Sequence, residues 1–258
     1  MITIPLDIHT AFNNVKYYDE PHKYFVDGVQ LTSVTQLIHK YENDFDSKYW
    51  SEYKAEQFNV TPEEVLDAWS FINLKGTMKG SIVHDYAENL FNDKIFPYPK
   101  EKILKTFGFD PIWNEYLISK NHVDNFYKDS HNKLIPIKLE YVIYDLRYKI
   151  GGMIDCLFYN VKEQEFQIWD YKTNKDFTYD NKRGDMLKGQ LSMLKECDHE
   201  IYSLQLGAYK KIIEENTSIK IGKSYLIWLS HRNNNYKIIE TLDRDYYVDI
   251  MFNNNILN

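Results

Sequence analysis

The sequence predicts an α/β (α+β) protein in which a mixed central β-sheet is flanked by helices and the N-terminal half is mainly helical. Two observations predict this class. Apolar residues recur at helical spacing in residues 47–127, whereas residues 133–173 alternate between apolar and polar positions as strands do. A further helix and a strand pair follow, so a single sheet with helices packed on it accounts for the order of the elements.

An N-terminal hairpin is the first element. Residues 23–34 hold two extended runs around Asp27-Gly28, a dipeptide that favours a two-residue hairpin turn. Thr32 or Ser33 can then cap a short helix over residues 34–41.

Helical segments come next, and we expect them at residues 47–58, 61–74, 80–91 and 111–127. The second begins with a capping box at Thr61 and Glu64, and we expect Gly76 to stop it. The same position divides the chain into an N-terminal part, residues 1–75, that packs on a core formed by residues 76–258.

The C-terminal half alternates between strands and helices. We expect strands at residues 133–145, 148–160, 165–173, 223–231 and 236–241, a helix at 200–216 and a last helix from about Asp243.

The composition is that of an ordinary globular chain. It has 258 residues and a net charge of 31 − 38 = −7, which excludes a uniformly basic nucleic-acid coat but not a local basic groove. Two cysteines, Cys156 and Cys197, exclude a disulfide framework and a four-cysteine metal site. Because there is no secretory signal pattern and no apolar run of ~18 residues, we expect a cytoplasmic protein that makes no contact with a membrane.

The sharpest chemical feature is a predicted hairpin that carries two aspartates. If it is symmetric about residues 162 and 163, paired positions sum to 325, and 155 + 170 = 325. Asp155 and Asp170 would then face each other with Cβ atoms ~5 Å apart. Since side chains alternate faces, Lys172 shares the face of Asp170, and Tyr171 points away.

Two carboxylates this close share a proton or hold a cation. Mg²⁺ favours carboxylate oxygens, and a lysine beside it can stabilise charge on a phosphate. The set therefore indicates phosphodiester cleavage. The alternative is a surface hairpin with an ordinary ion pair. An apolar run before Asp170, and Gly151-Gly152, which leaves room for close backbone approach, favour the functional interpretation.

Other polar side chains could join this site. His84 lies on the 80–91 helix and could be a metal ligand or a structural histidine. Gln205 and Tyr209 share a helix face and could orient the lysine, touch the DNA backbone, or be partly buried with satisfied polar ends. Glu140 is polar among apolar neighbours and could reach the site directly or through a water.

Five short motifs occur in order along the chain: G-S-x-V-H (80–84), Glu140, G-G-M-I-D (151–155), D-Y-K-T (170–173) and Q-L-x-x-Y (205–209). Together they resemble the PD-(D/E)xK nuclease superfamily, in particular its RecB-type exonuclease branch. The segment around Ser33 also resembles the mitochondrial and phage single-strand exonucleases of that branch.

The resemblance implies a restriction-endonuclease-like core, DNA as the substrate and Mg²⁺ or Mn²⁺ as the cofactor. It implies metal ligands in His84, Asp155, Asp170 and the backbone carbonyl of Tyr171. Lys172 would be the catalytic lysine.

The rest of the catalytic set also follows from the resemblance. Gln205 and Tyr209 match the Q-x-x-x-Y pair of the branch, and Glu140 is expected to be a catalytic residue together with them. Two cysteines exclude the iron–sulfur cluster of some members of the branch. Without a G-x-x-x-x-G-K-[ST] motif, the chain is expected to be a stand-alone nuclease module or one subunit beside a separate partner.

Basic residues near these motifs could line a groove for DNA, although a solvated loop is the alternative for each. The candidates are Lys175, Lys182, Arg183 and Lys188, together with Lys75, Lys79, Lys172 and Lys195. Trp50, Trp69, Tyr171 and Tyr179 are available for base stacking.

We therefore expect a metal-dependent deoxyribonuclease, an exonuclease acting on DNA ends or single strands in phage or bacterial replication, recombination or repair. Its expected partners are DNA and a recombinase or single-strand-binding protein. The alternatives are a structure-specific or restriction-like endonuclease of the same superfamily, and a non-catalytic DNA-binding protein that retains the fold.

Overall fold

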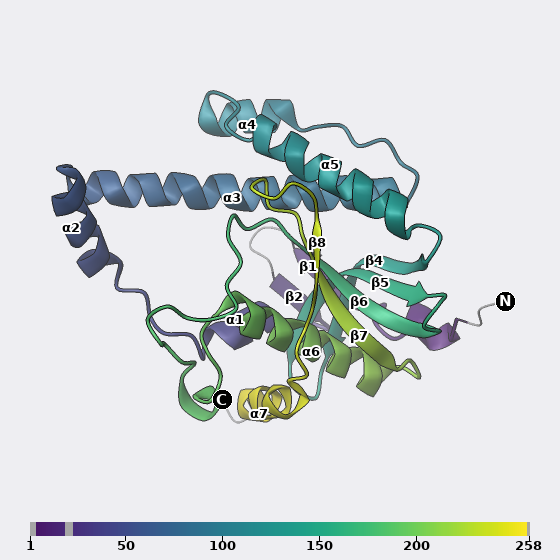
Figure 1. Cartoon of the computed structure of the whole chain (residues 1–258). Coiled ribbons are helices and arrows are strands. Elements are labelled where there is room, and N and C mark those ends of the chain that lie inside the picture. The colour runs from purple at the N-terminus through teal and green to yellow at the C-terminus, as the bar shows by residue number, and fades with distance from the viewer. Residues whose placement is uncertain (1–3, 19–22, 257–258) are drawn as a thin grey trace.

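A computed structural model describes residues 4–18 and 23–256 (Figure 1). Within these residues the strands form one eight-stranded sheet in the order β1-β2-β3-β5-β6-β7-β8, with β4 paired to β5 off this path. The strands are β1 (Val15–Tyr18), β2 (Lys23–Val26), β3 (Val29–Ser33), β4 (Leu134–Asp145), β5 (Ile150–Asn160), β6 (Glu165–Lys172), β7 (Ile221–Trp228) and β8 (Lys237–Glu240).

Helices cover both faces of the sheet, which confirms the predicted fold class. They are α1 (Val34–His39), α2 (Ser47–Phe58), α3 (Pro62–Phe91), α4 (Lys100–Phe107), α5 (Trp113–Ser130), α6 (Asp198–Asn216) and α7 (Asp245–Ile256), with short 3₁₀ helices at Leu6–His9 and Gly189–Leu191. In Figure 1, α3, α4 and α5 lie on one side of the sheet, and α1, α6 and α7 lie on the other.

Two apolar cores result from this arrangement. Leu157 and Ile168 pack toward α6, whereas their chain neighbours Phe158 and Trp169 pack toward α3 and α5. This is the alternation of faces expected along a strand. Because Asp170 lies two residues after Ile168, the alternation directs it, and then Lys172, toward α6.

The N-terminal hairpin and its cap are confirmed. Asp27 and Gly28 both have positive φ, at 49° and 82°, as a two-residue type I′ turn requires. Ser33 caps α1 in a capping box with Gln36. The hairpin joins the main sheet, because Ser33 pairs in parallel with Gly151.

The central hairpin has the predicted register. All five pairs, from Cys156 with Trp169 to Asn160 with Glu165, sum to 325. The ladder ends one step before Asp155 and Asp170. The two aspartates therefore lie where β5 and β6 stop pairing.

An opening in the sheet follows from this ending. Along one edge, β5 pairs with β4; along the other, it pairs with β3 only at residues 150–151 and with β6 only at residues 156–160. Residues 152–155 therefore have no strand partner on that second edge. A Cβ at Gly152 would lie 2.5 Å from Cε1 of Tyr209. The room left by this glycine is thus filled by a tyrosine ring, and the expected close backbone approach is wrong.

The helix break expected at Gly76 is also wrong, because α3 runs unbroken through Pro62–Phe91. The capping box of Thr61 and Glu64 is present as predicted. An exposed glycine within a helix costs about 1 kcal/mol relative to alanine but does not end it. The division expected at residue 75 falls inside this helix, and the outermost residues of the two expected parts, 1–3 and 257–258, lie outside the described residues.

Several elements carry no clear sequence signal. None of the elements expected from the sequence corresponds to β1, α4 or the two 3₁₀ helices. In the part of the chain that the structure describes, no helix combines the length and apolarity needed to cross a membrane.

Candidate functional site

Three side chains from three elements meet at the opening in the sheet. His84 comes from α3, Glu140 from β4 and Asp155 from β5, and their ligand atoms all lie within 4.8 Å of one another. His84 Nδ1 is 3.3 Å from Asp155 Oδ2. The same oxygen accepts a 2.8 Å hydrogen bond from the backbone N–H of Tyr171, so Asp155 bridges the gap between β5 and β6.

The backbone of β4 is distorted where it supplies Glu140. This residue has a φ of 45°, the only positive φ at a non-glycine residue inside a strand of the described chain. The β4–β5 ladder pairs Leu139 with Cys156 and Tyr141 with Ile154 without a shift, so Glu140 lies opposite Asp155 in the register, although these two residues are not themselves a ladder pair. Such strain costs about 1–3 kcal/mol and is concentrated at functional sites.

The two carboxylates of this group are not fully balanced by positive charge, and the pKa values of its members reflect this. Burial and the nearby Asp155 carboxylate raise the pKa of Glu140 to about 8. Burial alone would lower the pKa of His84, but Asp155 and other acids raise it to about 9. For Asp155, burial opposes ionisation, yet His84, Lys172 and the Tyr171 N–H hold its pKa below the usual value.

Two carboxylates and one imidazole at this separation fit a divalent cation. Carboxylate oxygens suit Mg²⁺ and Mn²⁺, and a neutral imidazole nitrogen is a common metal ligand. A cation would also relieve the repulsion that keeps Glu140 protonated near neutral pH. His84, Glu140 and Asp155 are therefore a candidate metal site.

A second polar group lies beside the first, on the α6 side of the sheet. Lys172 Nζ is 2.5 Å from Asp170 Oδ2 and donates a 3.1 Å hydrogen bond to Gln205 Oε1. The amide of Gln205 donates to Tyr209 Oη at 2.9 Å. Tyr202 contributes its ring, 4.4 Å from Lys172 Nζ. These contacts hold a largely buried lysine in one position.

Asp170, which the resemblance implies is a metal ligand, lies beside Lys172, and its role as a ligand stays a prediction. Among the described residues, it is not one of the acids grouped with His84, and its carboxylate contacts Lys172 instead. Burial and the Asp155 charge raise the pKa of Asp170 to about 6, although Lys172 opposes the shift.

Tyr171 has its side chain buried in the core under α3 and α5. A ring with only 2% of its surface exposed is not available for base stacking, so that expectation is wrong.

A pocket of about 800 Å³ opens beside the two groups. His84, Tyr171 and Lys172 line one part of it, and Lys175 is also in its wall. Three other expected DNA-binding residues are placed elsewhere. Arg183 packs on the Trp50 ring at 4.4 Å, Lys188 lies 3.4 Å from Asp44, and Lys182 is exposed outside the pocket lining. The expected basic groove thus divides into four lysines that line the pocket, Lys75, Lys79, Lys172 and Lys175, and residues away from it.

Some residues of this region were not found from the sequence. Tyr202 could have been, because it lies three residues before Gln205 and shares its helix face. Glu115 and His231, which contact Lys79 at the pocket wall, have no such signal. Their partners are distant in the chain, and no local pattern marks them.

No protein-family model matches the chain, and no curated protein matches it. Among solved structures, it is similar to a protein of Eubacterium rectale named "Putative exonuclease", with a TM-score of 0.43 and 13% identity over 71% of this chain. The chain spans 64% of that protein. It is also similar to SSO0001, with a TM-score of 0.29 and 14% identity over 61% of this chain and 69% of the other.

Proposed function

We propose that the protein is a metal-dependent deoxyribonuclease of the RecB-type branch of the PD-(D/E)xK superfamily, acting as an exonuclease on DNA ends or single strands. One observation carries the proposal: a candidate metal site and a fixed lysine lie together at the edge of a pocket lined by basic residues. Metal, cation and anion-binding pocket are the parts that phosphodiester hydrolysis needs.

His84, Glu140 and Asp155 would hold Mg²⁺ or Mn²⁺. When bound, such an ion polarises a phosphoryl oxygen and lowers the pKa of a coordinated water. To serve as ligands, His84 and Glu140 release the protons that their raised pKa values retain in the metal-free protein.

Lys172 supplies a positive charge for the phosphate as it gains negative charge. The contacts with Asp170 and Gln205 fix the position of its ammonium before substrate binds, which is how a preorganised charge lowers a barrier. The pKa of Asp170, at about 6, lies close enough to neutral pH for this carboxylate to accept a proton during the reaction.

The test is degradation of end-labelled DNA with Mg²⁺, Mn²⁺ or chelator, by the wild type and by Glu140→Gln and Lys172→Met. We expect metal-dependent loss of label in the wild type and none above background in either variant. Equal activity in chelator, or full activity in both variants, would contradict the proposal. Lys220→Gln is the matched control, because Lys220 is exposed and precedes β7 at the opposite end of that strand from the pocket.

The substrate form is tested separately. Circular single-stranded DNA has no ends, so an exonuclease leaves it intact while cutting the linear form. Cleavage of the circle would replace the proposed exonuclease with the endonuclease alternative. Binding of DNA without cleavage under any metal would favour the non-catalytic alternative.

A further inference from the structure

The pocket wall contains more basic than acidic groups. Its lining includes Lys75, Lys79, Lys172 and Lys175 but only one carboxylate, that of Glu115. Lys172 is compensated by Asp170. The other three lysines leave an excess of positive charge in a protein whose net charge is −7.

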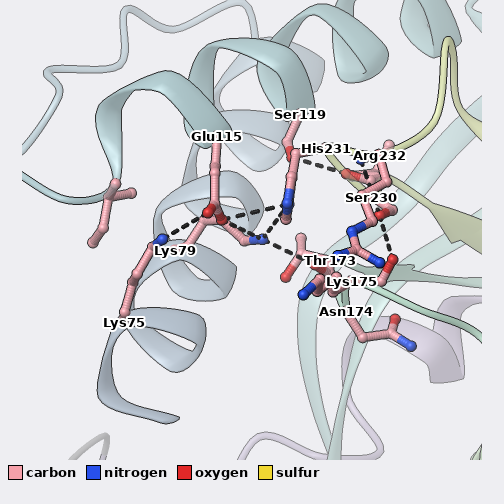
Figure 2. Close-up of polar contacts among 12 residues, drawn as sticks. Lys75, Lys79, Glu115, Ser119, Thr173, Asn174, Lys175, Ser230, His231 and Arg232 are labelled. Atoms are coloured by element: carbon pink, nitrogen blue, oxygen red, sulfur yellow. Dashed lines mark hydrogen bonds and ion pairs between the residues drawn. The ribbon is translucent and has the colours of Figure 1, made fainter. Parts of the chain in front are cut away.

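Three basic side chains converge on the Glu115 carboxylate (Figure 2). Lys75 Nζ lies 2.6 Å from Oε1, Lys79 Nζ 3.3 Å from Oε2, and His231 Nδ1 3.4 Å from Oε2. They come from α3 and from the turn after β7, whereas Glu115 comes from α5. A single carboxylate cannot neutralise both lysines, so the cluster carries net positive charge.

Lys79 forms the fixed base of this cluster. Its side chain is only 5% exposed, and its ammonium also donates a 3.1 Å hydrogen bond to the carbonyl of Thr173. The contact ties α3 to the end of β6, directly after Lys172. Because its ammonium is buried and held by these contacts, Lys79 adds positive charge to the pocket wall without contacting a ligand directly.

Lys75, although paired with Glu115, and Lys175 are the lysines of this wall whose side chains are accessible to a ligand. The side chain of Lys75 is a quarter exposed. Lys175 is exposed, and within the described residues no carboxylate lies at ion-pair distance from it. Its backbone carbonyl accepts a 2.7 Å hydrogen bond from the Ser230 hydroxyl, which anchors this part of the segment after β6.

The basic cluster is separate from the candidate metal site. Lys75 precedes His84 by nine residues on one continuous helix, which at ~1.5 Å per residue is about 13 Å along the axis. One phosphate cannot contact both positions. A ligand that uses both must carry at least two phosphates in a chain.

We propose that Lys75 and Lys175, supported by the Lys79–Glu115–His231 cluster, form a second phosphate-binding site for a single nucleic-acid strand whose scissile phosphate lies at the candidate metal site. This inference rests on the proposed function and adds a feature of the substrate, a phosphate remote from the cleaved bond. A pocket of about 800 Å³ lies in the range that holds one elongated ligand, so it accommodates a segment of one strand and not a duplex.

Phe71 provides a surface for a base at the rim of the pocket. Its ring is 39% exposed and is supported by Phe107 at 5.5 Å and by Phe109, stacked at 6.3 Å. Stacking on such a ring binds bases with little regard to sequence. A strand held by lysines through phosphates and by Phe71 through a base is bound without sequence preference.

The first experiment measures binding without cleavage. Fluorescence anisotropy of a labelled oligothymidylate in chelator is followed over a range of salt for the wild type, Lys75→Gln, Lys175→Gln and the double variant. Because each phosphate contact contributes about −0.7 to the slope of log K against log salt, we expect the slope to fall by about 0.7 per variant. Lys220→Gln should keep the wild-type slope. A double variant with wild-type affinity and slope would overturn the inference.

The second experiment separates this inference from the proposed function. In Mg²⁺, the double variant should raise KM about tenfold on a long single strand and change kcat less than twofold, and the variant and wild type should act alike on a dinucleotide. If the double variant cleaves the long strand with unchanged KM, the second phosphate site is contradicted, whereas the proposed nuclease function is supported. If the wild type binds the strand in a way that depends on these lysines but does not cleave it, the proposed nuclease function is contradicted and the phosphate site is supported.

The source of the phosphate is decided by competition. Inorganic phosphate and an unlabelled oligothymidylate are each titrated against the labelled strand. Displacement by the oligonucleotide at concentrations at least a hundredfold lower than those of inorganic phosphate supports a site for a strand. Equal potency would show a site for the free anion and overturn the inference.

Discussion

The candidate metal site and the basic cluster around Glu115 share α3, and they have opposite charge imbalances. At His84, two carboxylates crowd one imidazole, and the group lacks positive charge. At Lys79, two ammonium groups and one imidazole surround a single carboxylate, and the group lacks negative charge. One helix can thus contribute to a group that suits a cation and to a group that suits an anion, a few turns apart.

Removing a charge that acts on the scissile phosphate should have the largest effect. Lys172→Met keeps the length of the side chain and loses its charge, so we expect kcat to fall about 10³-fold, the loss seen when one preorganised group is removed from a reacting centre. Lys75→Gln, in the other region, should instead act on KM. Steady-state cleavage rates over a range of substrate concentrations measure both, and a large fall in kcat for Lys75→Gln would contradict the distinction between the two regions.

Metal binding should stabilise the protein only through the acidic region. At a Mn²⁺ concentration about 100 times Kd, the free energy of unfolding should rise by about 2.7 kcal/mol, or about 5–10 °C in melting temperature for a chain of this size. Glu140→Gln should show little of this gain, and Glu115→Gln should show all of it. Thermal denaturation with and without Mn²⁺ makes the comparison, and a full gain in Glu140→Gln would place the metal elsewhere.

The pH dependence of metal affinity sharpens the assignment. His84 and Glu140, with pKa values of about 9 and 8, hold protons at neutral pH that metal binding must displace. Affinity for Mn²⁺ should therefore rise at least tenfold per pH unit between pH 6 and 8 and level off above about pH 9. Calorimetry in buffers of different ionisation enthalpy counts the protons released, and Glu140→Gln should release one fewer.

The same substitution should have opposite effects on stability in the two regions. Burial and repulsion raise the pKa of Glu140, so wild-type stability declines as pH rises from the unfolded value toward about 8. Lys75, Lys79 and His231 lower the pKa of Glu115 despite its burial, so its contribution is present above the unfolded value and lost as pH falls. At pH 8 in chelator, Glu140→Gln should melt a few degrees above the wild type and Glu115→Gln a few degrees below.

Both substitutions replace one carboxylate oxygen of a glutamate by an amide NH2 group, so the two variants lose the same charge and keep the same side-chain shape. Shifts of the same sign would show that the regions do not differ in charge balance. Glu101→Gln is a suitable control, because Glu101 is exposed in the first turn of α4, outside both regions.

Local patterns predicted much of the fold and the centre of the candidate site. The register of β5 and β6 could be found because their turn is short and pairing fixes every later contact. The approach of Gln205 to Lys172 agrees with helical spacing on α6. In contrast, nothing local reveals that Glu140 leaves the ladder with a positive φ, because that distortion depends on how β4 and β5 pair.

The basic cluster around Glu115 shows most clearly what local sequence patterns cannot predict. Lys79 and Glu115 are 36 residues apart, and Lys79 and His231 are 152 apart. Lys79 lines the pocket, as its candidate place in a groove allows, but the contacts with the Thr173 carbonyl and Glu115 that hold its ammonium could not be predicted. Long-range ion pairs of this kind follow from tertiary packing, which no spacing rule records.

Because α3 continues unbroken through Gly76, it fixes the distance between the residues that it carries. Lys75 and His84 lie on one rigid rod, two and a half turns apart, so the distance between them cannot adjust to the ligand. Inserting a single residue between Lys79 and His84 would turn everything before it by about 100° relative to the sheet. In the proposed complex, α3 sets the spacing between the phosphate at Lys75 and the phosphate at the candidate metal site, and a change in the helix would reset it in whole turns but not by single residues.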